Sequence, residues 1–448
     1  MIRRTHAFMA ALLLVFLFSC GRDYREEMRG PIEQFYRGQP YEAAQSLLPY
    51  VNKSGRDQLL FLMEAGYLLH AAEKYEDSNR VLLKAAAMAK VKPISISKEV
   101  AALLTNQTMT NYRGEDFEKV LVHMYLGINY LMLDNAEDAA VEFKAVNNEL
   151  QKIKNEKGEA RYKQNLMAKY LAAIAHELRA DTTGDEYDRE YAEVEYRQIL
   201  QIKPALSMAR RDLASMGQRA GSGNGELVVV FQAGRAPIKV SRGRLMEDPG
   251  MKTSLYVALG SQSLAAGVTA ASVMTAITAA QNPIPRFQTR STSVRSLRVT
   301  VGNRRVMTQS LENIEETAIR NLEDDYSRLR GKVAASIITK AVVSLGAGIA
   351  AQEVTRKLSD GNRGLSSLMG LLVGSGTGVA LFATMRPDLR CWHTLPANLQ
   401  LARVPLQPGT HSARLDLIGH NGAVLESRNV NFEINKNGKR FITIRTVQ

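Results

Sequence analysis

The sequence predicts a multidomain α+β protein, in which an all-α array of helical repeats precedes an α+β domain that ends in a small antiparallel β-sheet or sandwich. Three observations predict this fold class. Residues 24–216 are rich in Ala, Leu, Tyr and Glu, residues 217–225 are rich in glycine, and the chain from residue 398 onward alternates apolar and polar residues between turn signals. With 448 residues, 45% of them hydrophobic, the chain can form two or three domains with substantial cores.

Residues 1–19 are predicted to be a lipoprotein signal peptide. Arg3 and Arg4 give a positive start, residues 8–18 form an uncharged apolar run, and the small Ser19 precedes Cys20. This pattern resembles the bacterial lipobox, which implies cleavage before Cys20 and acylation of its thiol. The next residue is glycine rather than the aspartate typical of inner-membrane retention, which favours the periplasmic face of the outer membrane. The alternative is an ordinary signal peptide followed by an incidental cysteine.

Residues 20–216 are predicted to form an array of helical hairpins. The clearest unit joins residues 126–130 to Ala139, Phe143 and Val146, a spacing that resembles the tetratricopeptide repeat; two weaker units precede it and one follows. Such arrays leave a concave groove that commonly binds a peptide or a protein surface, and the alternative is that the helices only brace the rest of the protein. We expect the groove to be lined by polar and aromatic side chains of the repeats: Tyr67, Tyr125, Asn129, Tyr130 and Tyr170.

The glycine-rich residues 217–225 predict a flexible linker, and residues 226–396 a mixed region of strands and long helices. Residues 227–231 are a β-branched apolar run, which is typical of a buried strand. Residues 311–329 have the pattern of an amphipathic helix with acidic residues toward its start.

Residues 365–385 are twenty-one residues without a charge, and glycines recur in them at four-residue spacing. This pattern is typical of closely packed transmembrane helices. Export machinery tends to stop such helices at the inner membrane, so a buried element of a soluble core is the favoured interpretation. Membrane insertion is the alternative.

Residues 397–448 are predicted to be an antiparallel β subdomain. Residues 399–404, 412–418, 423–432 and 440–447 form the strands, and Gly- and Asn-containing segments between them supply the turns.

The positive charge is concentrated in one part of the chain. The whole sequence has a formal net charge of +13, and residues 217–310 contain twelve Lys or Arg against three acidic residues. Export excludes nucleic acid as the partner, so the hypothesis is an anionic surface of the cell envelope. The alternative is that these cations are solvated faces without a ligand.

A segment near the start of the β subdomain carries a family resemblance. Residues 386–396 read RPDLRCWHTLP, and Arg403 and residues 406–409 (LQPG) follow. This run resembles a family of uncharacterised bacterial lipoproteins with a helical-repeat N-terminal half. The resemblance covers most of the chain, with poor matches over residues 241–295. Members are often said to be encoded near lipoproteins that resemble activators of penicillin-binding proteins, which implies a role in envelope assembly. No catalytic residue is established for the family, so the resemblance implies none here.

The same segment has a physical interpretation. Trp392 is the only tryptophan of the chain, and Asp388 lies two residues from both Arg386 and Arg390, close enough for a local ion pair. We expect these residues to form a clasp between the helices and the C-terminal sheet. A docking site for a partner is the alternative.

No motif for catalysis, a metal or a cofactor is recognised. Cys391 and His393 are discounted as a nucleophile pair, because neighbours in a strand are not expected to face each other. The sequence therefore predicts a non-catalytic outer-membrane lipoprotein that acts as a scaffold in envelope assembly and binds an envelope or periplasmic protein through its repeats. The alternative is a membrane-inserting or oligomeric component of an export or motility apparatus that uses residues 365–385.

Overall fold

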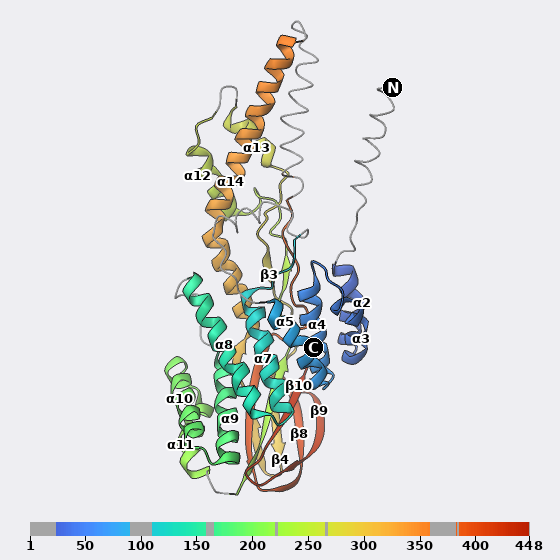
Figure 1. The fold of residues 1–448 in the computed structure, drawn as a ribbon, viewed down its shortest axis with the longest axis vertical. Coiled ribbons are helices and arrows are strands. Elements are labelled where there is room, and N and C mark those ends of the chain that lie inside the picture. The colour runs from blue at the N-terminus through green and yellow to red at the C-terminus, as the bar shows by residue number, and fades with distance from the viewer. Residues whose placement is uncertain are drawn as a thin grey trace.

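The computed structural model describes residues 24–89, 110–157, 165–219, 223–264, 268–358, 382 and 385–447 (Figure 1). The signal peptide, Cys20 and all of residues 365–385 except Phe382 and Met385 lie outside the described residues. Within those ranges, none of the helices combines the length and the apolar character that a bilayer crossing requires.

The predicted N-terminal helical array is present. Successive helices pack pairwise as antiparallel hairpins, α2 with α3, α4 with α5, α7 with α8 and α9 with α10. Apolar side chains of all these helices share one continuous core. The helices are α2 (Tyr24–Tyr36), α3 (Pro40–Val51), α4 (Gln58–Ala71), α5 (Tyr75–Met88), α7 (Asp116–Met132), α8 (Ala136–Lys157), α9 (Leu166–Thr183), α10 (Glu186–Ile202) and α11 (Ser207–Arg219).

Glycines allow the close helix crossings that the repeat pattern predicts. A Cβ at Gly127 of α7 would lie 2.5 Å from the Phe143 ring of α8. We therefore expect Gly127→Ala to lower the free energy of unfolding by about 1–3 kcal/mol through overpacking. Gly331→Ala, within the helix Ile314–Leu358, is the control: nothing lies within 4 Å of its added methyl and no proline directly follows it, so we expect a gain of about 0.5–1 kcal/mol. Urea unfolding of the two variants measures both effects, and equal shifts would contradict the packing argument.

Two four-stranded sheets stack beside the array, one in the order β10-β1-β7-β6 and the other in the order β5-β4-β8-β9. The strands predicted after residue 397 are present, but they are divided between the two sheets, and β10 pairs parallel with β1. They therefore do not form a sheet of their own. The strands are β1 (Gly225–Ala233), β4 (Val294–Val301), β5 (Arg304–Met307), β6 (Gln309–Asn313), β7 (Asn398–Leu406), β8 (Gly409–Gly419), β9 (Val424–Ile434) and β10 (Lys439–Arg445).

Strand β1 is covered on both faces, and all nine of its residues are buried. Val228 and Val230 belong to the core shared with the helical array, whereas Leu227, Val229 and Phe231 belong to the core between the sheets. Because a strand buried on both sides has no polar face, its central residues 227–231 form an unbroken apolar run, and the buried Glu226 and Gln232 flank this run. The array thus lies against one face of the first sheet, and the second sheet lies against the other.

A helical arm extends away from this body (Figure 1). Its main element, α14 (Ile314–Leu358), has 45 residues and is about 68 Å long at 1.5 Å per residue. It begins three residues later than the sequence predicts, because residues 309–313 pair with β7 as β6. Helices α12 (Pro249–Gly260) and α13 (Ala270–Ile277) pack on α14 around a separate apolar core, which includes Phe382 and Met385. The short strands β2 (Ile238–Val240) and β3 (Arg286–Gln288) pair with each other.

Candidate functional site

The side of the helical array that faces the first sheet is covered by the chain itself. Gln232 of β1 is 1% exposed, and its side chain meets three groups from α4 and α7. The Tyr67 hydroxyl donates to Oε1 of Gln232 at 2.9 Å, the Tyr125 hydroxyl donates to the same atom at 3.4 Å, and Nε2 of His70 lies 2.7 Å from Nε2 of Gln232. These polar contacts fix the sheet against the repeats.

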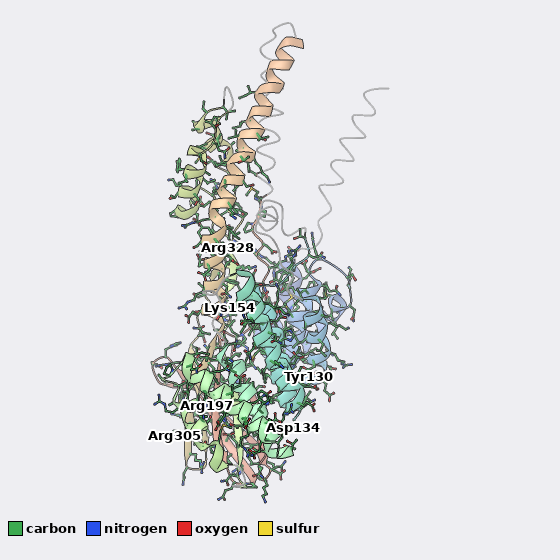
Figure 2. The ribbon with its side chains drawn as sticks, turned by 60° about the vertical axis from the view of Figure 1, so that its left-hand side comes forward. Tyr130, Asp134, Lys154, Arg197, Arg305 and Arg328 are labelled. Atoms are coloured by element: carbon green, nitrogen blue, oxygen red, sulfur yellow. The ribbon has the colours of Figure 1, made fainter. Side chains whose placement is uncertain are left out.

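This arrangement corrects the prediction of an open groove lined by the repeat side chains. Tyr67, Tyr125, Asn129 and Tyr170 have no exposed surface. The physical reason is that the apolar face of the first sheet must also be buried, and the array supplies the surface that buries it. Tyr130 differs from the other four, since it is half-buried and lies beside Asp134 at the end of α7 (Figure 2).

Residues 392–394 lie in a segment without regular secondary structure, and two buried carboxylates accept hydrogen bonds from its backbone. The backbone N–H of Trp392 donates to Oε1 of Glu118 in α7 at 2.7 Å. Glu64 of α4 accepts from the backbone N–H of His393 at 2.6 Å and from the hydroxyl of Thr394 at 2.6 Å. Both carboxylates are fully buried, and burial raises the pKa of Glu118 to about 7. The array therefore holds this segment of its own chain as it would hold a bound peptide.

The predicted clasp residues take different positions. Arg390 bridges Asp388 and Asp57, the residue before α4, with 2.7 Å from its guanidinium to each carboxylate. Among the described residues, Arg386 donates instead to the carbonyl of Met385 at 3.3 Å. Trp392 is 1% exposed and packs against the rings of Tyr67 and Tyr125, with ring centroids 6.4 and 6.1 Å away. Arg390, Asp388 and Trp392 thus join the segment to the array, and Arg386 does not take part in their ion pairs.

The expectation that Cys391 and His393 do not face each other is wrong. The Cys391 Sγ lies 4.0 Å from Nε2 of His393, because residues 385–397 are irregular rather than a strand. The Nδ1 of His393 lies 3.5 Å from Oε1 of Glu64. The thiol is 1% exposed, so this trio is packed inside the junction between segment and array.

The buried His70 gives the junction a pH dependence. Burial lowers its pKa to about 4, and its Nδ1 lies 2.5 Å from the Asn129 amide oxygen. A folded-state pKa below the unfolded value of 6.5 means that stability is fully present above pH 6.5 and is lost as the pH falls toward 4, by about 3 kcal/mol. We expect His70→Gln to lack this pH-dependent loss of stability. The wild-type unfolding free energy should therefore fall relative to that of the variant by about 3 kcal/mol between pH 7 and pH 4. Parallel pH profiles in urea unfolding would contradict this assignment.

A second junction lies at the other end of the first sheet, around Arg403 of β7. Its guanidinium has no exposed surface and contacts carboxylates of three elements: Glu226 of β1 at 2.5 Å, Glu177 of α9 at 2.6 Å and Asp212 of α11 at 3.2 Å. Lys439 of β10 lies 3.2 Å from Glu177. Burial alone would raise the pKa of Glu177, but the two cations hold it well below its usual range. The guanidinium also donates to the Tyr196 hydroxyl of α10, so the cluster ties the sheet to the last three helices of the array.

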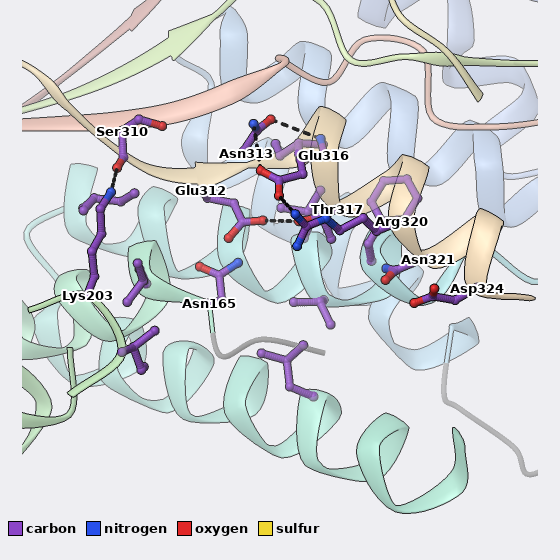
Figure 3. A pocket seen from close by; sticks show the side chains of 18 residues that line it. Asn165, Lys203, Ser310, Glu312, Asn313, Glu316, Thr317, Arg320, Asn321 and Asp324 are labelled. Atoms are coloured by element: carbon purple, nitrogen blue, oxygen red, sulfur yellow. Dashed lines mark hydrogen bonds and ion pairs between the residues drawn. The ribbon is translucent and has the colours of Figure 1, made fainter. Parts of the chain in front are cut away.

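A cavity of about 400 Å³ lies where α7, α8 and the start of α9 meet β6 and the start of α14 (Figure 3). The helical array supplies mainly apolar side chains, including Phe117, Val120 and Leu166. The opposite wall is polar and contains Glu312 and Asn321. Burial raises the pKa of Glu312 to about 7.

Four of the twelve cations in residues 217–310 are used inside the protein. Lys239 pairs with Glu115, Arg242 with Glu323 and Arg298 with Asp416, while Arg290 donates to the Tyr36 hydroxyl. Fewer cations are therefore available to bind an anionic surface than the sequence suggests. The exposed cations are spread over several elements, and two of them share β5, where Figure 2 labels Arg305: Arg244, Lys252, Arg286, Arg295, Arg304 and Arg305.

Sequence reasoning missed Glu64, Glu118 and Arg403, which organise both junctions. A signal was present for Glu64, because its neighbours in the helix are apolar (LLFLMEAGYLL), whereas Glu118 stands between Asp116 and Lys119 in an ordinary polar surface pattern. An acidic side chain among apolar residues is buried only if it has hydrogen-bond or ion-pair partners. Arg403 also stands among apolar residues (LQLARVPL), but its three partners come from distant segments, and nothing local marks Glu312.

The described residues contain no group of three or more His, Cys, Asp or Glu side chains that could hold a metal ion. Comparison of the chain with protein-family models, with curated proteins and with solved structures gave no match.

Proposed function

We propose that this protein is a lipid-anchored scaffold on the periplasmic face of the outer membrane, and that it binds an envelope protein through its helical arm. The anchor rests on the lipobox-like sequence that ends at Cys20. The arm replaces the repeat groove as the proposed contact surface, because the chain's own sheet and the segment around Trp392 cover the residues expected to line that groove.

The observation that carries this proposal is the independent construction of the arm. Its apolar core is separate from the two cores of the body, so the arm can keep its shape at a distance from the body. It also leaves large apolar side chains in water: Tyr256 and Val257 of α12 are 52% and 69% exposed, and Val343 of α14 is 66% exposed. Exposed apolar side chains on a projecting element are typical of a protein-binding surface.

A site-specific photo-crosslinker tests the partner surface in living cells. We expect a crosslinker in place of Val257 to give a discrete product with another envelope protein. The matched control replaces Arg197, whose side chain is 62% exposed on α10 of the body. Absence of a product at Val257, or the same products at both positions, would contradict the proposed surface.

The anchor is tested separately with Cys20→Ala and carbonate extraction of membranes. Release of the variant into the soluble fraction supports a lipid anchor. Retention would favour the alternative, a membrane-inserting or oligomeric component of an export or motility apparatus that uses residues 365–385.

A further inference from the structure

The cavity between the array and the start of α14 has the size and composition of a small-molecule site. Its volume of about 400 Å³ lies within the range of ligand pockets. It is formed by segments far apart in sequence, α7 to α9 on one side and β6 and α14 on the other (Figure 3). A ligand there would contact both the helical array and the base of the arm.

The two walls differ in chemistry. The array contributes Phe117, Val120, Leu121, Leu150 and Leu166, which offer a surface for an apolar group. The β6–α14 wall contributes carboxylates and amides, and Figure 3 shows Glu312, Asn321 and Asp324 along it. An occupant that fits both walls is therefore amphipathic.

Two polar groups of the second wall retain hydrogen-bonding capacity. The Glu312 carboxylate accepts a hydrogen bond from the Thr317 hydroxyl at 2.9 Å through Oε1, which leaves Oε2 available. The Nδ2 of Asn321 is buried and, within the described part of the chain, has no acceptor. Because a buried donor without an acceptor costs about 1–3 kcal/mol, a ligand oxygen at this place would be favourable.

The cations of the cavity are already engaged. Lys203 donates to the Ser310 carbonyl at 3.2 Å, and Arg320 pairs with Glu316 at 2.5 Å. The β6–α14 wall carries the carboxylates of Glu312, Glu316 and Asp324 against the single cation of Arg320, so its negative charges outnumber its positive ones. Burial, together with the nearby Glu316 charge, raises the pKa of Glu312 to about 7, and a ligand cation would favour its ionised form.

We propose that this cavity binds a small hydrophobic amine of the amino-amide type. Its ammonium would donate to Glu312, its carbonyl oxygen would accept from Asn321, and its apolar side chain would lie against α7 and α9. The inference is independent of the proposed scaffold function, since it concerns another surface and another class of ligand.

Calorimetric titration of the full-length protein with L-leucinamide tests the proposal, and N-acetyl-L-leucinamide, which lacks the ammonium, is the matched probe. We expect leucinamide to bind and the acetylated compound to bind at least about tenfold more weakly, the usual scale of a lost charge-assisted hydrogen bond. No heat with leucinamide, or equal affinity for both compounds, would overturn the proposal.

Variants assign the contacts. Glu312→Gln is expected to weaken leucinamide binding about tenfold or more and Asn321→Ala severalfold, whereas Glu433→Gln, an exposed acid on β9, should change nothing. Thermal unfolding of each variant verifies that it is folded. Unchanged affinity in Glu312→Gln would overturn the proposal.

The pH dependence gives a second readout. The other charged side chains that line the cavity are Lys203, Glu316, Arg320 and Asp324, none of which has an ordinary pKa near 7. The ammonium of leucinamide, with an ordinary pKa of about 7.7–8.0, only becomes more fully charged over this range, so affinity should still fall about tenfold from pH 7.5 to 5.5 as Glu312 is protonated. This fall should be absent in Glu312→Gln, and its persistence there would contradict the assignment.

Discussion

Arg403→Gln is expected to lower the free energy of unfolding by about 3–5 kcal/mol at pH 7, the range measured when one partner of a buried ion pair is removed. The substitution leaves Glu177, Glu226 and Asp212 buried with Lys439 as the nearest remaining cation. Urea unfolding measures the effect. Arg305→Gln on the exposed strand β5 is the control, and it should change stability by less than about 0.5 kcal/mol.

The pH dependence of the stability loss in Arg403→Gln distinguishes the removal of an ion pair from a simple packing defect. Without the guanidinium, the folded-state pKa of each carboxylate should rise, so the variant should bind protons on folding as the pH falls. The stability difference from wild type should therefore be smaller at pH 5 than at pH 7. A constant difference across this range would contradict the electrostatic explanation.

Trp392→Ala is also expected to lower the free energy of unfolding by about 3–5 kcal/mol, because it removes a large side chain that is fully buried between the segment and the array. Trp392→Phe should cost clearly less, since it keeps most of the ring volume. Tyr187→Ala is the matched control: this ring is 73% exposed on α10, so its truncation should stay within about 0.5 kcal/mol. Similar losses in the two alanine variants would contradict the buried position of Trp392.

The fold class was predictable because its signals are local. The repeat spacing around Leu126 and Phe143 reports the contact of two neighbouring helices, and the apolar run of residues 227–231 reports a strand buried on both faces. Both patterns depend on residues close together in the chain. The helical array, β1 and the strands β7 to β10 were therefore predicted at nearly their observed positions, whereas β6 was predicted as the start of a helix.

The occupied groove was not predictable from local patterns. Tyrosines such as Tyr67 and Tyr125 are expected at these positions whether a partner protein or the chain's own Gln232 covers them. The division of the C-terminal strands between two sheets has the same origin, because β10 pairs with β1 across more than two hundred residues. Arg403 and the cavity at Glu312 likewise arise only when distant segments meet.

The central claim is that the helical array holds residues 392–394 of its own chain. Hydrogen exchange of these residues tests it most directly. The segment has no regular secondary structure, so its amides can be protected only by the Glu118 and Glu64 carboxylates that accept from them. Mass-spectrometric exchange should show these amides as slow as those of the buried strand β1. Exchange as fast as that of the exposed turn at Asn421 and Gly422 would show that the segment is not docked and would contradict the account.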